Sequence, residues 1–198
     1  SDGNACTIAS NDLNSKGCVH VQIAGCCGNS ACDAGEENRC LIDCPYSDPL
    51  NISLASYPAP FTENLSFNTN IIVGANGSAE LVVAGIDIIR PLVFKKAGEG
   101  YSTNALLDRQ VAAIADHNVF LIGNACQNRF VRQLMIPASN PDCHDGLRKN
   151  EGLIRLYKTG AATYALVVSG YDEQAVRRAA QLLNMYNQSK LAGFEARI

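Results

Sequence analysis

The chain of 198 residues has few of the features by which proteins bind polyanions or lipid. Its 16 Lys and Arg are outnumbered by 19 Asp and Glu, and no run of basic residues occurs, so we do not expect a nucleic-acid partner. The longest apolar stretch, 81–94, is interrupted by Asp87, Arg90 and Pro91. It is too short and too charged to cross a bilayer, so we expect no membrane span either.

Histidine and the common catalytic motifs are scarce as well. The three histidines, His20, His117 and His144, are better interpreted as solvent-facing or hydrogen-bonded within the fold than as catalytic bases. Ser169-Gly170 lacks the first glycine of a Gly-x-Ser-x-Gly motif. The glycine-containing loops have neither the three-glycine spacing of a dinucleotide site nor the lysine of a P-loop. The sequence therefore predicts no enzyme and no required cofactor.

Cysteine, in contrast, is abundant and unevenly distributed. Seven of the nine cysteines lie within the first 44 residues. The complete set is Cys6, Cys18, Cys26, Cys27, Cys32, Cys40, Cys44, Cys126 and Cys143. Disulfides at this density persist in oxidising compartments, and the start at Ser1 fits the removal of a signal peptide. We therefore expect a secreted protein, located outside the cell or at the cell surface.

Cys126 and Cys143 are the expected disulfide pair outside the N-terminal region. The adjacent Cys26 and Cys27 are expected to bond to different partners. Because seven is an odd number, one N-terminal cysteine is a buried free thiol, bridges to the rest of the chain, or bonds to another molecule.

One short loop of the N-terminal region has the composition of a metal site. Its oxygen ligands would be Asp33, Glu36, Glu37, Asn38 and Asp43. Ligands of this kind suit Ca²⁺, although their spacing is not that of an EF-hand, and the cysteine spacings do not fit zinc. The loop is a candidate calcium site, and a solvated acidic surface is the alternative interpretation.

The chain also contains four Asn-x-Ser sequons. Their asparagines are Asn51, Asn64, Asn76 and Asn187. In a secreted protein these are acceptors for N-linked glycans and mark surface positions. The sequence therefore predicts a glycoprotein.

Composition divides the chain into three parts. Residues 1–46 form a small disulfide-rich head. Residues 47–66 contain prolines among Ser, Asn and Tyr without an apolar period, which predicts an extended linker. Residues 67–198 have the composition of an ordinary globular domain.

Three similar segments within 67–198 predict strand-to-helix units. Each is a short apolar run that ends in a glycine, at 70–74, 119–123 and 166–170. The runs do not alternate, which is typical of parallel strands covered on both faces. The expected helix N-caps are Ser78, Asn124 and Asp172, and the third helix should carry an exposed Glu173–Arg177 pair.

Two alternating segments predict antiparallel additions to this sheet. Gly152–Lys158 can pair with 163–168 as a hairpin, and 194–198 can add an edge strand where a neighbouring molecule can pair. The expected fold class is α/β: a mixed, mostly parallel sheet flanked by helices and preceded by the disulfide-rich head.

These segments resemble a known family. In order along the chain, 70–88, 118–128, 152–157 and 165–180 look like the α/β domain of archaeal surface-layer (S-layer) proteins. The likeness covers residues 67–198. Separately, 27–44 is similar to a small cysteine motif attached to many secreted prokaryotic proteins.

The resemblance implies a structural protein and not a catalyst. The expected function is a secreted subunit that assembles with copies of itself into a surface-layer-like array or an extracellular filament. Surface-layer proteins are usually longer, so the chain would be a short subunit or one part of a longer protein. Two alternatives stay open: a monomeric adhesin or glycan-binding module with a calcium-stabilised head, and a secreted hydrolase that uses carboxylates on the strand-to-helix loops.

Overall fold

The chain divides into two compact units, Ser1–Pro49 and Leu50–Ile198. In the first unit the described residues form an antiparallel hairpin of β1 (Thr7–Asp12) and β2 (Gly17–Gln22). The second unit contains the remaining elements. The computed structural model describes residues 7–12, 17–22, 52–63, 66–67, 69–93, 104–135, 142–144 and 146–198.

The second unit is built on a mixed six-stranded sheet with the strand order β10-β8-β9-β7-β5-β6. Its parallel strands are β5 (Asn70–Val73), β6 (Ala105–Leu107), β7 (Val119–Ile122) and β9 (Tyr164–Gly170). Two antiparallel strands, β8 (Gly152–Lys158) and β10 (Glu195–Arg197), extend it. The predicted α/β fold with a mixed, mostly parallel sheet is confirmed. A separate two-stranded pair is formed by β3 (Thr62–Glu63) and β4 (Ser66–Phe67).

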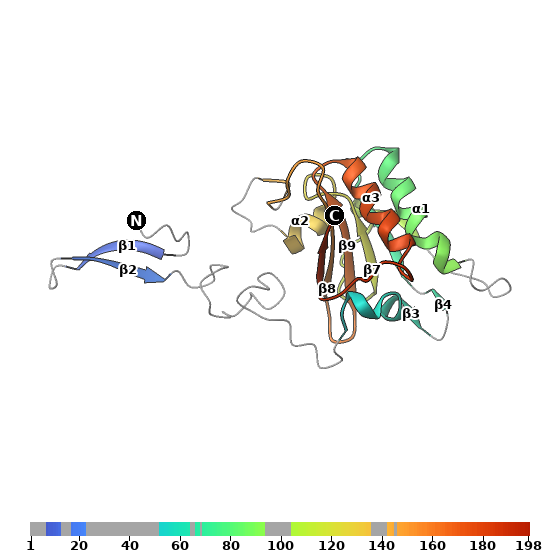
Figure 1. The fold of residues 1–198 in the computed structure, drawn as a ribbon, viewed down its shortest axis with the longest axis horizontal. Helices are drawn as coiled ribbons and strands as arrows, with labels where there is room; N and C mark the ends of the chain where they lie inside the picture. Colours follow the sequence, from blue (N-terminus) through green and yellow to red (C-terminus); the bar gives the residue numbers. More distant parts are fainter. Residues whose placement is uncertain are drawn as a thin grey trace. The chain divides into compact units, whose positions relative to one another are not determined.

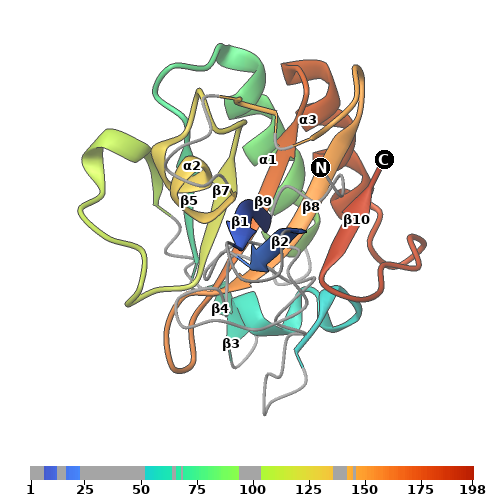
Figure 2. The same cartoon turned by 90° about the vertical axis from the view of Figure 1, so that its left-hand side faces the viewer.

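Helices cover both faces of this sheet. α1 (Ala79–Val93) and α3 (Glu173–Asn184) pack side by side on one face, and α2 (Arg129–Met135) lies on the other (Figure 1, Figure 2). Every residue of β7 and β9 is buried. Because both faces of these strands are covered, their sequences are continuous apolar runs without alternation.

The segment predicted as an extended linker is partly folded onto the second unit. It forms two short 3₁₀ turns, η1 (Leu54–Ser56) and η2 (Ala59–Phe61). The side chains of Leu54, Tyr57 and Phe61 are buried. These three anchors have the i, i+3, i+7 spacing of one helix face, but the prolines at 58 and 60 interrupt them, and a proline-containing composition is typical of a linker. The described part of the predicted linker, 52–63, therefore belongs to the folded unit that begins at Leu50.

Strand β6 has no counterpart among the predicted strands, because three residues are too few to form a recognisable pattern. It lies at the edge of the sheet beside β5, while β7 lies on the other side of β5. The chain therefore passes from β5 to β6 in one direction and then returns past β5 to β7. In open α/β sheets, ligands bind at the carboxyl ends of the strands where the order reverses in this way.

Candidate functional site

The carboxyl ends of β5 and β7 are covered by a cluster of polar side chains, which we call the switch-point cluster. It draws on the loop before α1, the short η3 helix (Asp108–Gln110) after β6, the loop after β7 and the first turn of α3. Its members are Ser78, Asp108, Gln127, Asn128 and Glu173. The contacts of these side chains decide whether they are free to bind a ligand.

Asn128 lies at the centre of the cluster and is fully buried. Its Nδ2 donates to the carbonyl oxygens of Ile72 in β5 and Ile122 in β7, at 3.0 and 3.2 Å. Its Oδ1 accepts from the backbone N–H groups of Phe130 and Val131, at 3.0 and 3.4 Å. One side chain thus connects the ends of two parallel strands and caps the start of α2.

The N-cap expected at Asn124 is therefore wrong for α2, which begins at Arg129. Asn124 instead accepts from the N–H groups of Cys126 and Gln127, at 3.0 and 3.2 Å, and closes a separate turn before the helix. The expected caps at Ser78 and Asp172 do accept backbone hydrogen bonds at the starts of α1 and α3. Both asparagines have capping chemistry, so their identity alone did not locate the start of α2.

Asp108 joins β6 to the neighbouring loops. It is buried, its Oδ1 accepts from Ala75 N at 3.0 Å, and its Oδ2 accepts from Arg129 N at 2.8 Å. The carboxylate is thus placed at the N-terminus of α2, where the helix dipole favours negative charge. In turn, Arg129 Nε donates a hydrogen bond to the carbonyl oxygen of Asp108 at 3.1 Å.

Glu173 connects the first turns of α3 and α1. Its Oε1 accepts from Ser78 N at 2.9 Å and from Gln127 Nε2 at 2.7 Å, and its Oε2 accepts from Ser78 Oγ. The predicted Glu173–Arg177 pair is wrong, because Arg177 extends to α1, where it lies 2.8 Å from Glu80 and 3.7 Å from Asp87. Partners on a neighbouring helix replaced the local pair.

The switch-point cluster is therefore bonded to itself and to the backbone. Both carboxylates, Asp108 and Glu173, already accept from N–H or O–H groups with each of their oxygens. This arrangement holds the loops at the strand ends in place. Among the residues that the structure describes, no group of three or more His, Cys, Asp or Glu is placed to hold a metal ion.

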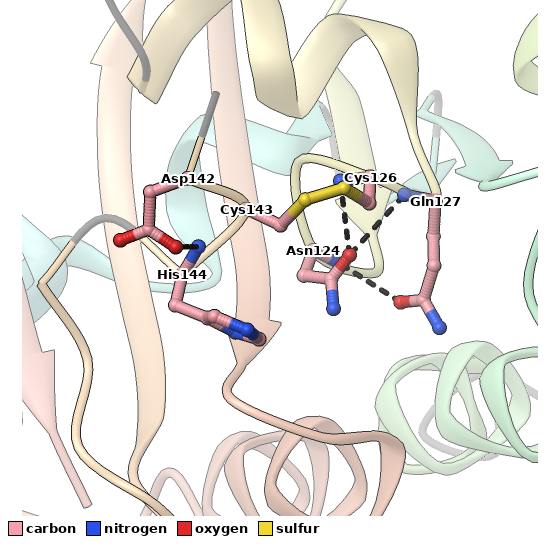
Figure 3. Close-up of a disulfide and its surroundings, with 6 residues drawn as sticks. All are labelled: Asn124, Cys126, Gln127, Asp142, Cys143 and His144. Atoms are coloured by element: carbon pink, nitrogen blue, oxygen red, sulfur yellow. Dashed lines mark hydrogen bonds between the residues drawn. A yellow bond between two sulfur atoms is a disulfide. The ribbon is translucent and has the colours of Figure 1, made fainter. Parts of the chain in front are cut away.

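A disulfide lies next to this cluster (Figure 3). It joins Cys126 and Cys143, the pair expected from the sequence, across 17 residues with their Cα atoms 5.1 Å apart. Beside it, His144 N donates to Asp142 Oδ1 at 3.0 Å, and the imidazole stacks on Tyr171 with 4.1 Å between ring centroids. The bridge fixes the loop of Cys143 against the turn that follows β7.

The other residues singled out in the sequence do not enter this cluster through their side chains. Asn76 and Asn187 are exposed, in the loop before α1 and after α3, and His117 is exposed. Cys18 and His20 lie in β2. Outside the described residues lie the calcium candidates Asp33, Glu36, Glu37, Asn38 and Asp43, the sequons at Asn51 and Asn64, and the cysteines Cys6, Cys26, Cys27, Cys32, Cys40 and Cys44.

No family model and no curated protein matches this chain. The resemblance to archaeal surface-layer proteins therefore stays a prediction. No helix within the described residues has the length and apolar composition needed to cross a membrane.

A second charged cluster surrounds the edge strand β10. Glu195 Oε2 accepts from Arg155 Nε at 2.6 Å, and its Oε1 accepts from Arg197 Nε at 2.6 Å. Arg197 also lies 3.8 Å from Glu151. Burial alone would raise the pKa of Glu195, but the hydrogen bonds and charges of Arg197 and Arg155 outweigh it and hold the pKa below its ordinary value.

The lowered pKa predicts that the Glu195 cluster stabilises the fold when the pH is above the ordinary glutamate pKa of about 4.3. At a pH far below that value the cluster should contribute nothing. A carboxylate with a lowered pKa in the folded state stabilises that state at neutral pH, and the contribution disappears as the pH falls through the lowered value. We expect wild type to be more stable than Glu195→Gln at pH 7, and the difference to shrink as the pH is lowered to 3. Urea unfolding at both pH values measures this, and a difference that does not change with pH would contradict the assignment.

Proposed function

We propose that this protein is an extracellular structural subunit that assembles with copies of itself into a surface-layer-like array or a filament. The observation that carries the proposal is the outer surface of α1, where Val82 and Ile86 are 46% and 52% exposed. They lie four residues apart and so share one face of the helix. A helix that is apolar on nearly all sides is normally covered on nearly all sides.

The contacts of α1 explain why this face is left uncovered. Leu81, Ala84 and Ile88 are buried against the sheet. Its acidic residues Glu80 and Asp87 face α3, where both lie near Arg177. On the remaining side Val82 and Ile86 are open to solvent, with the exposed Arg90 one turn beyond Ile86. Contact with a second copy would remove the two apolar side chains from water.

Two further observations support an extracellular structural role over the alternatives. The Cys126–Cys143 disulfide is typical of proteins that fold in an oxidising compartment. The carboxylates that a hydrolase would need at the strand-to-helix loops, Asp108 and Glu173, are occupied by bonds within the fold. The hydrolase and adhesin alternatives have no comparable support among the described contacts.

Replacing both exposed residues of α1 tests the proposal. We expect Val82→Glu with Ile86→Glu to abolish large assemblies, because charge on this face opposes its burial against another copy. Each exposed replacement should change the free energy of unfolding by no more than about 0.5 kcal/mol. Light scattering and electron microscopy at increasing protein concentration provide the measurement. Met185→Glu is the matched control, since Met185 is 49% exposed but lies outside α1.

The same experiment separates two failures. Wild-type protein that remains a monodisperse monomer at high concentration would refute the structural-subunit proposal. Assembly of the α1 double variant at wild-type concentrations would refute only the role of Val82 and Ile86. Loss of assembly in Met185→Glu as well would show that added charge acts nonspecifically.

A further inference from the structure

The open edge of β10 has a charge pattern that is complementary to itself. Within the part of the chain that the structure describes, β10 is the edge strand of the six-stranded sheet and pairs with β8 on one side only. Its sequence places an acidic and a basic residue, Glu195 and Arg197, on either side of Ala196. An edge strand can pair with a strand from another molecule, and charges of a single sign commonly prevent this. Here the two signs alternate.

The hydrogen bonds to β8 determine which backbone groups of β10 are open. Gly152 of β8 and Ile198 exchange two backbone bonds, each 2.9 Å long. Residues of antiparallel strands bond to a given neighbour at every second position, so the even-numbered residues of β10 face β8. The N–H and C=O groups of Glu195 and Arg197 therefore point to the open edge.

We propose that two copies of this chain pair through β10 as antiparallel strands, with Glu195 of each copy opposite Arg197 of the other. In this register both residues contribute outward backbone groups, and Ala196 lies opposite its own equivalent. Sliding one strand by two residues would place Glu195 opposite Glu195 or Arg197 opposite Arg197, and like charges directly opposite are unfavourable. Charge therefore selects a single register, and its twofold symmetry makes the contact isologous.

The Glu195 side chain is already held in place for this contact. Arg197 bonds Glu195 of its own chain, and in the pair it exchanges that carboxylate for the one of the opposing copy. Because β10 alternates, Glu195 and Arg197 lie on one face of the sheet, where Arg155 is the neighbour of Glu195 on β8. Arg155 Nε holds the Glu195 carboxylate at 2.6 Å, which reduces the side-chain entropy lost on pairing. In the pair, Arg155, Glu195 and the opposing Arg197 form a row of alternating charge across the two sheets.

This inference rests on the proposed function and specifies one of its contacts. The twofold β10 contact joins two subunits into a pair. The exposed face of α1 provides a different contact, through which pairs associate into a larger assembly. The β10 contact is therefore measured in the Val82→Glu/Ile86→Glu background of the full chain, where it acts alone.

A charge exchange between two variants tests the register. Glu195→Lys makes both positions basic, and Arg197→Glu makes both acidic, so each variant alone brings like charges together at both symmetric contacts. We expect each to raise the dissociation constant of the pair at least about tenfold. An equimolar mixture brings opposite charges together again and should recover to within about threefold of the parent. Sedimentation velocity measures the three samples.

Two variants with the same fold serve as controls. Arg197→Pro removes an outward N–H without removing a backbone bond to β8, so it should abolish pairing. It should lower the unfolding midpoint only by what the contacts of Arg197 with Glu195 and Glu151 contribute. Arg197→Lys keeps the charge and should pair. The β10 contact would be overturned if both charge variants still paired, or if the mixture did not regain the affinity of the parent. In either case, assembly of the wild-type protein would still support the proposed function. If the Val82→Glu/Ile86→Glu parent and the wild-type protein were both monomeric, the β10 contact and the proposed function would both be refuted.

Discussion

Replacing Gly170 by alanine is expected to lower the free energy of unfolding by about 3 kcal/mol, because α3 lies directly against the backbone of this residue. A Cβ atom added at Gly170 would lie 2.6 Å from Val176 N and 2.9 Å from the carbonyl carbon of Ala175. Both are backbone atoms of the helix, so rotation of a side chain cannot relieve the overlap. The helix itself must move away from the sheet.

The surroundings of Gly170 explain why this movement is costly. Gly152 is its direct partner in the β8–β9 pair, and a Cβ added there would lie 2.7 Å from Ala175 O. Two glycines side by side thus form a smooth surface on which α3 packs through Ala175 and Ala179. Moving α3 outward would loosen the contacts of its whole buried face, including Leu183.

Gly146→Ala is the matched control for this prediction. Gly146 has φ = +67°, and a Cβ added there would meet nothing within 4 Å. It should therefore cost only the preference of an L residue against the left-handed region, about 1 kcal/mol. Urea unfolding followed by circular dichroism compares the two variants. Equal losses in both would mean that the close approach of α3 does not require glycine at position 170.

The sequence correctly predicts where these glycines lie in the fold. It does not predict why glycine is required at each of them. Gly74, Gly123 and Gly170 end the three apolar runs, and a glycine between a strand and a helix commonly permits a tight turn. Gly123, with φ = +115°, fits that expectation. Gly74 and Gly170 have no positive φ, and each is required because another backbone approaches it closely. Such an approach depends on which distant segments pack together, and local sequence does not record this.

The same distinction separates the predictable from the unpredictable parts of the site. The strands β5, β7 and β9 and the β8–β9 hairpin follow from local apolar patterns. Asp108 and Asn128 have no local pattern, because their partners Ala75 and Ile72 lie 33 and 56 residues away along the chain. A lone polar residue beside an apolar run is equally typical of a solvent-exposed turn. Only the strand order, which includes the unpredicted β6, brings these groups together.

Asn128→Ala is the second substitution with a large expected effect, a loss of about 3 kcal/mol in the free energy of unfolding. The change removes the cap of α2, which contributes about 1 kcal/mol, and two buried bonds, each of about 1 kcal/mol. Those bonds link the ends of β5 and β7 through Ile72 O and Ile122 O. Asn124→Ala, which removes only the cap of a turn, should cost about 1 kcal/mol.

Asn128→Asp separates the two roles of this side chain. Aspartate keeps an oxygen for the N–H groups of Phe130 and Val131, so the cap of α2 can persist. It cannot donate to Ile72 O and Ile122 O, and its charge would face both carbonyl oxygens at a position that is fully buried. Asn128→Asp should therefore be less stable at pH 7 than Asn128→Ala, as measured by urea unfolding. Stability equal to wild type would show that capping alone matters, and that the switch point is held together by the backbone rather than by Asn128.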